Sequence, residues 1–144
     1  MQYILDASLI ETEDALAKQQ KSSDQLKIYL QTSLDFFRSD PAISKIYIAF
    51  YYLSSFNKVY FDMNEKLKSE AVQRILNILA IGLGRGEFKI ENPLLAAKVI
   101  HIYITGLLLN LATENSQFSD ELLLEKLQRD CLLSVGVTLF AFNS

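Results

Sequence analysis

The side chains that most often carry chemistry are scarce in this sequence. His101 is the single histidine and Cys131 the single cysteine among 144 residues. Metal ligation needs several ligands, and no histidine, cysteine or acid stands three or four positions from His101, so a core or interface role is favoured. Cys131 falls on an apolar stripe and is interpreted as inert packing, since redox sensing would need a disulfide between two copies. No metal and no cofactor are expected.

Motifs that mark enzymes are also missing. The glycine-rich segment 82–86 follows a predicted helix rather than a strand and precedes no Lys-Ser or Lys-Thr pair, so it is not a phosphate-binding loop. No G-x-S-x-G or H-E-x-x-H pattern occurs, and a lone histidine removes most general-base schemes. The sequence therefore predicts that the chain is not an enzyme.

A cluster of aromatic residues is the strongest remaining candidate for a binding function. It consists of Phe36, Phe37, Tyr47, Phe50, Tyr51, Phe56 and Tyr60. Tyrosine suits the wall of a ligand pocket because it offers apolar area together with one orienting hydroxyl. Core packing is the alternative and is favoured for any single member, whereas a pocket is an equally good interpretation of the group.

Composition and charge narrow the class of protein. Half of the residues are hydrophobic and 22% are charged, as in a single folded domain spanning residues 1–144. A net charge of -3 gives no general attraction to nucleic acid. No basic segment followed by a long apolar run begins the chain, and the most apolar window, 99–112, is shorter than the ~20 residues of a membrane span. We expect a soluble, cytoplasmic protein without a membrane segment.

Apolar periodicity predicts about six helices and no strand, an all-α fold. The expected segments are 4–18, one from Ser22 to about residue 39, one from Pro41, one from about residue 63, 93–112, and one capped by Ser119. Asp40-Pro41 and Asn92-Pro93 are typical helix starts. Ser22 with Gln25, and Asp62 with Glu65, are candidate capping boxes.

The stretch 75–111 organises these elements. Gly82, Gly84 and Gly86 are expected to end one helix. The helix over 93–112 is apolar on nearly every face and so requires burial on all sides, which a second copy of the chain would supply. Gly106 and Gly136, each placed inside an apolar helix at a cost of ~1 kcal/mol, favour close approach of a partner helix, with intrachain packing as the alternative.

Several short motifs resemble the C-terminal regulatory domain of TetR/AcrR-family transcriptional repressors. They are Gly84-Arg85-Gly86-Glu87-Phe88, Asn92-Pro93, Thr105-Gly106-Leu107 and the entry Phe37-Arg38-Ser39-Asp40-Pro41. The resemblance covers nearly the whole chain, but the helix-turn-helix of the family is missing, and residues 1–20 look like the helix that follows it. The resemblance implies that DNA is bound only through the missing helix-turn-helix module.

The resemblance also implies where a partner and a ligand would bind. The last two long helices would form a four-helix bundle with a second copy, through Ile100, His101, Ile104, Gly106, Leu107, Leu108, Leu124, Leu127, Cys131, Leu132, Val135 and Gly136. A small apolar or aromatic effector would lie among the seven aromatic residues and Leu79. The expected function is an effector-sensing, homodimeric regulatory domain, and the alternative is a helical homodimeric scaffold without an effector.

Overall fold

The computed structural model describes residues 6, 7, 10, 14, 15, 17, 21–113 and 121–137. The described helices are α2 (Ser22–Ser39), α3 (Pro41–Leu53), α4 (Lys58–Gly84), α5 (Pro93–Leu111) and α6 (Glu121–Ser134). No strand occurs in this part of the chain, so the predicted all-α class is confirmed for it. The six described positions before residue 21 are helical, while the rest of the expected helix over 4–18 lies outside the described residues.

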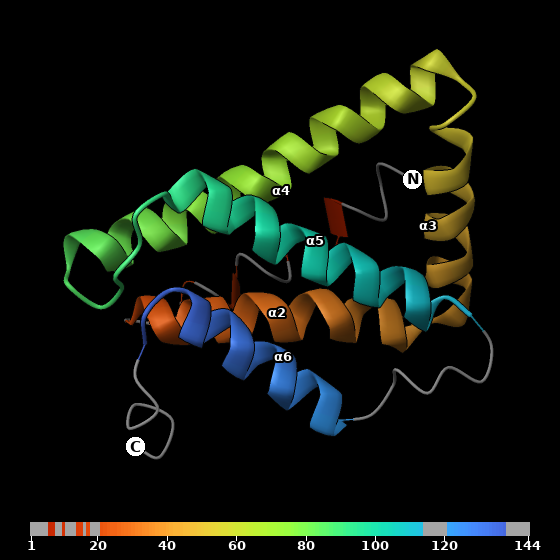
Figure 1. Cartoon of the computed structure of the whole chain (residues 1–144). Helices are drawn as coiled ribbons and strands as arrows, with labels where there is room; N and C mark the ends of the chain where they lie inside the picture. The colour runs from red at the N-terminus through yellow and green to blue at the C-terminus, as the bar shows by residue number, and fades with distance from the viewer. Residues whose placement is uncertain are drawn as a thin grey trace.

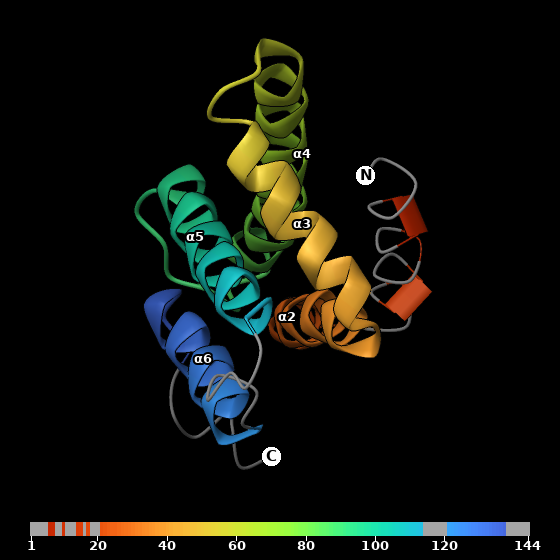
Figure 2. The ribbon, with the colours of Figure 1, turned by 90° about the vertical axis from the view of Figure 1, so that its right-hand side faces the viewer.

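The helices pack around α2. The long helix α4 runs beside α5, and α2 contacts α3, α4, α5 and α6 (Figure 1). Helix α3 crosses the end of this group and contacts α2, α4 and α5 (Figure 2). The helices α2, α3, α4 and α5 therefore surround a common interior, and α6 covers α2 from the other side.

The core follows the periodicity of α2. Leu26, Leu30 and Leu34 stand four positions apart, on one face of the helix, and each is at most 2% exposed. Their fully buried partners from the other helices are Ile75 and Leu79 of α4, Ile100 of α5 and Leu132 of α6. The apolar face of α2 thus joins four helices in one core.

Side-chain caps fix the starts of three helices. Asp40 accepts a hydrogen bond from the amide of Ala42 at 2.9 Å, and Asn92 accepts one from that of Leu95 at 3.0 Å, which confirms both predicted starts. Asn57 caps α4 through the amide of Val59 at 2.9 Å. The predicted start of α4 at Asp62 is wrong, because Asn57 in an extended conformation already ends the preceding turn.

The predicted capping box at Ser22 is also wrong. Ser22 is the first residue of α2, is fully buried, and has no side-chain cap before it. Its amide instead donates to both carboxylate oxygens of Glu87, each at 3.1 Å. A negative charge at a helix N-terminus is stabilising because the exposed amides carry partial positive charge. The α4–α5 connection therefore caps α2 from far along the chain.

Glycines shape the two helix ends that meet at this connection. Helix α4 ends at Gly84, and Gly86 has a φ of 77°, the left-handed conformation expected after a helix. Gly136 was predicted inside a helix, but α6 ends at Ser134 and Gly136 has a φ of 83°. A Cβ there would stand 3.0 Å from the carbonyl oxygen of Lys89, so the close approach at Gly136 is intrachain.

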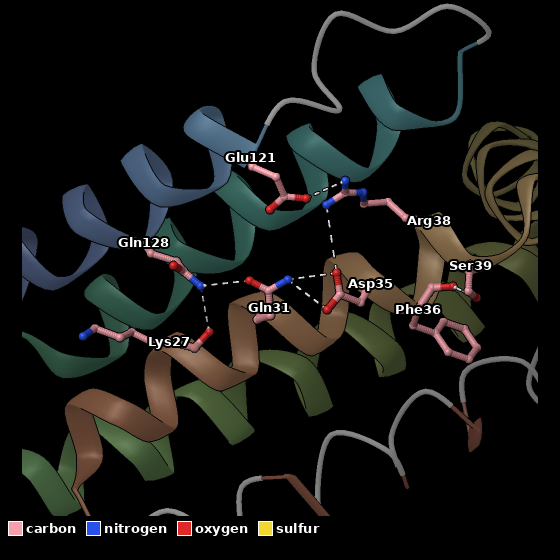
Figure 3. Close-up of polar contacts among 8 residues, drawn as sticks. All are labelled: Lys27, Gln31, Asp35, Phe36, Arg38, Ser39, Glu121 and Gln128. Atoms are coloured by element: carbon pink, nitrogen blue, oxygen red, sulfur yellow. Dashed lines mark hydrogen bonds and ion pairs between the residues drawn. The ribbon is translucent and has the colours of Figure 1, made fainter.

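Polar side chains hold α6 against α2 (Figure 3). Gln128 of α6 donates to the carbonyl oxygen of Lys27 at 3.2 Å and lies 3.5 Å from the side-chain oxygen of Gln31. At the start of α6, Glu121 forms an ion pair with Arg38 at 2.8 Å. The predicted cap Ser119 lies outside the described residues.

Candidate functional site: a cavity between the central helices

A cavity of about 120 Å³ lies between α2, α3, α4 and α5. Its lining residues are Asp6, Tyr29, Ser33, Phe37, Tyr47, Phe50, Tyr51, Asn64, Leu67, Lys68, Glu70, Ala71, Arg74, His101, Ile104, Thr105 and Leu108. Apolar side chains supply most of the wall, with polar groups converging from several helices. This is the usual composition of a small-molecule pocket.

The aromatic part of the wall comes from α2 and α3. The rings of Phe37 and Tyr47 meet edge to face with their centroids 4.9 Å apart, and Tyr51 lies 6.2 Å from Tyr47. Phe50, only 5% exposed, is held from behind by the ring of Tyr60 at 6.0 Å. Because each ring has an aromatic neighbour, the wall is supported by packing outside the cavity as well as inside it.

A row of hydrogen-bonding groups crosses the cavity. The hydroxyl of Tyr47 lies near that of Thr105, and the Thr105 hydroxyl lies 3.4 Å from Nε2 of His101. Burial raises the pKa of Tyr47 to about 12, so its hydroxyl stays protonated. Burial, followed by the charge of Lys68, lowers the pKa of His101 below its ordinary value, so the ring is neutral at pH 7. The row offers neutral donors and acceptors to a ligand.

Apart from Asp6, the charged residues of the lining lie along α4. Arg74 lies near the buried hydroxyl of Tyr29, whose pKa is raised by burial and partly lowered again by the Arg74 charge. Glu70 lies 3.9 Å from Arg74. Lys68 forms an ion pair with Glu65 at 2.9 Å and lies 5.7 Å from the ring of Tyr51. The cavity therefore has an aromatic part and a charged part.

A second, wider hollow of about 400 Å³ adjoins this cavity on the outer side of α4 and α5. Its lining residues are Glu65, Lys68, Ser69, Val72, Gln73, Leu94, Lys98, His101 and Ile102. Lys68 and His101 line both spaces, so their side chains stand between the cavity and this outer groove.

The predicted pocket residues divide into two groups. Phe37, Tyr47, Phe50 and Tyr51 line the cavity. Of the others, Phe36 and Leu79 are core residues, Phe56 is 74% exposed, and Tyr60 is 37% exposed behind Phe50. The sequence reasoning missed Tyr29, Arg74 and Thr105. By periodicity Tyr29 falls on the apolar face of α2 and Arg74 on the polar face of α4, so neither is marked as a pocket residue.

Most of the predicted interface side chains are buried within one chain. Those at most 5% exposed are Ile100, Ile104, Leu108, Leu124, Cys131, Leu132 and Val135. Leu107 and Leu127 are partly buried, Gly106 and Gly136 are exposed, and His101 lines the cavity. Burial raises the pKa of Cys131 to about 12, as expected for an unreactive thiol. Dimerisation itself stays a prediction.

The exposed apolar surface of α5 is formed mostly by residues other than the predicted interface residues. Leu95, Ile102 and Tyr103 are 57%, 64% and 44% exposed, so one chain buries only the inner side of this apolar helix. Apart from its two chain neighbours and the backbone of its own helix, no atom of the described residues lies within 4 Å of a Cβ placed on Gly106. Residues 95, 99, 102, 103, 106 and 110 share this outer face, which is the part of α5 available to a partner.

Among the described helices, α5 alone is long and apolar enough to cross a membrane. Its 19 residues have a mean hydropathy of 1.7. The helix is longer than the apolar window 99–112, from which the sequence predicts no membrane segment. Core helices of soluble proteins pass the same test by length and composition, and here the inner face of α5 packs into the core.

The fold and the cavity together define an all-helical domain with a partly open, small-molecule-sized space between its helices. A solved structure with this fold is described as a bacterial regulatory protein in the tetR family from Rhodococcus RHA1. The two match with a TM-score of 0.64 at 17% sequence identity, over 94% of this chain and 73% of the Rhodococcus chain. The chain therefore has a TetR-like fold.

Sequence comparisons add nothing to this assignment. No protein-family model matches the sequence, and no curated protein matches it. At 17% identity the likeness to the Rhodococcus protein concerns the fold alone.

Proposed function

We propose that this chain is the effector-sensing, dimerising part of a TetR-like transcriptional regulator. The observation that carries the proposal is a cavity lined by Phe37, Tyr47, Phe50 and Tyr51 inside a fold shared with a tetR-family regulator. DNA contact would belong to a part of the parent protein outside this chain, in keeping with the net charge of -3.

The cavity is placed so that a ligand would touch four helices at once. Its walls come from Tyr29 of α2, Tyr47 of α3, Arg74 of α4 and Thr105 of α5, among others. A ligand shifts a conformational equilibrium only by its difference in affinity for the two states. Contacts that span four helices provide such a difference, because any movement of one helix against another changes the shape of the cavity.

Dimerisation is the second half of the proposal. The open apolar stripe on α5, containing Leu95, Ile102 and Tyr103, is the surface we assign to a second copy. Native mass spectrometry tests this assignment, with a species of twice 16.4 kDa expected. A chain that remains monomeric at micromolar concentration would refute dimerisation and leave the proposed effector cavity unaffected.

The effector half is tested by a thermal-unfolding screen of small aromatic compounds against the native chain and an Ala71→Leu variant. Ala71 lines the cavity, so the larger side chain would occupy ligand space. A compound at 100 times its Kd adds about 2.7 kcal/mol of stability to the native chain, and this gain should disappear in the variant. Equal shifts in both proteins, or no shift with any compound, would favour the scaffold without an effector.

A further inference from the structure

The volume of the cavity matches a ligand with one ring. The cavity volume is about 120 Å³, compared with roughly 150 Å³ for an engineered apolar cavity that holds benzene. A single six-membered ring suits a space of this size, and a short substituent would reach toward the polar, partly open side of the lining. A fused ring system would have to extend beyond this volume, toward the open side of the cavity.

The walls favour an aromatic ring over an aliphatic one. Phe37 and Tyr47 already pack edge to face at 4.9 Å, and Phe50 and Tyr51 line the same space. A planar ligand ring can continue this pattern of offset and edge-to-face contacts, each of which adds to the gain from apolar burial. Ile104 closes the wall from α5.

Arg74, in the charged part of the lining, offers its guanidinium to an anionic group of a ligand. Its side chain is 29% exposed and lies near the buried hydroxyl of Tyr29, whose pKa its charge lowers against the larger effect of burial. Glu70, the acid beside it, lies 3.9 Å away, beyond hydrogen-bond distance, and lies equally far from Lys66. A guanidinium has five N–H donors in a planar fork that matches a carboxylate. Within the described residues, Arg74 therefore keeps donors for a ligand anion.

The other charged groups of the lining are engaged differently. Lys68 is held by Glu65 at 2.9 Å, with its ammonium over the Tyr51 ring. Asp6 has a polar interaction of its own. His101, neutral at pH 7 because burial and Lys68 lower its pKa, offers a hydrogen bond without a charge. Arg74 is thus the lining base whose ion-pair partner on α4, Glu70, lies beyond hydrogen-bond distance.

We propose that the cavity selects a monocyclic aromatic carboxylate, with its ring against Phe37 and Tyr47 and its carboxylate on the guanidinium of Arg74. This inference rests on the proposed effector-binding function and specifies the chemical class of the effector. The carboxylate would lie at the partly exposed part of the lining, so its charge is paired without being fully removed from water.

Isothermal titration of the native chain with benzoate, benzamide and benzylamine tests the proposal, because the three probes share a ring and differ in charge. Benzoate should bind at least tenfold more tightly than either of the others. In Arg74→Gln, benzoate affinity should fall at least tenfold, with benzamide affinity changed less than twofold. Arg74→Lys should lie between them, since it retains the charge but loses the fork. Arg129→Gln on the exposed face of α6 removes the same charge outside the cavity lining and should leave the affinities of all three probes unchanged.

Each other outcome overturns a defined part of the proposal. Tighter binding of benzylamine, or equal losses of benzoate and benzamide affinity in Arg74→Gln, would refute the carboxylate contact. Preferential binding of 2-naphthoate would refute the match to a single ring. Both results would leave an effector cavity in place. If no compound of any size shifts the unfolding temperature of the native chain, the proposed function itself fails. Should Arg74→Gln not fold, the order of the three probes on the native chain still decides.

Discussion

Replacement of Gly82 by alanine should destabilise the protein although it removes a glycine from a helix. Gly82 lies within α4, where alanine is favoured by about 1 kcal/mol. A Cβ at this position, however, would stand 2.3 Å from two ring carbons of Phe88 and 2.9 Å from Cβ of Ser22. Phe88 is 2% exposed and Ser22 is fully buried, so neither can move into solvent. Overpacking of this kind costs about 1–3 kcal/mol.

The magnitude follows from the balance of these two effects. Because the contact with Phe88 is far inside van der Waals distance, we place the packing cost near the upper limit, about 3 kcal/mol. After subtraction of the helix gain, Gly82→Ala should lower the free energy of unfolding by about 2 kcal/mol. For a chain of this length that corresponds to a fall of roughly 6 °C in the unfolding temperature.

Urea unfolding followed by circular dichroism measures this difference, with Gly84→Ala as the matched control. Gly84 is the last residue of the same helix and has open space around it, so its replacement should leave stability unchanged or slightly raised. Combining Gly82→Ala with Phe88→Leu should recover part of the loss, because the two sites are in contact. A Gly82→Ala protein as stable as the native chain would refute the packing of Phe88 against α4.

Three further predictions concern α5, the cap of α2 and the cavity histidine. Gly106→Ala should stabilise the protomer by about 0.5–1 kcal/mol and weaken the dimer, as measured by urea unfolding and sedimentation; an unchanged dimer would move the interface away from this face of α5. Glu87→Ala should cost about 1 kcal/mol in urea unfolding through loss of the cap on Ser22, whereas the exposed Glu91→Ala in the same connection should cost little. His101 has a lowered pKa in the folded chain, so the unfolded chain binds its proton first and stability should fall as pH drops from about 6.5 through the folded pKa. His101→Asn should lose less stability over that window, and parallel pH profiles would contradict the burial of the ring.

Local signals in the sequence determine much of the fold. Asp40-Pro41, Asn92-Pro93 and Gly86 act on the residues beside them. The helix starts and the helix end that they determine can therefore be predicted without a structure. The cap of Ser22 could not be predicted in this way, because its acceptor Glu87 is brought close only by the packing of the α4–α5 connection. Gly136 was misassigned for the same reason, since its constraint is the backbone of Lys89.

The candidate site was only partly predictable. Aromatic spacing on α2 and α3 indicated Phe37, Tyr47 and Phe50, which do line the cavity. The same spacing included Phe56, which lies beyond the end of α3 and is exposed. Arg74 reads as one of several surface charges of α4, and its contact with Tyr29 depends on how two helices pack. Periodicity assigns a residue to a face but not to a neighbour.

An aromatic NMR titration of the native chain locates the ligand most directly. The compound giving the largest thermal shift would be added while ring resonances of the nine phenylalanines and seven tyrosines are followed. Binding in the cavity predicts shift changes concentrated on Phe37, Tyr47 and Tyr51, with the exposed ring of Phe56 unaffected. Changes confined to Phe56, or no changes at saturating ligand, would contradict an effector-binding cavity between the central helices.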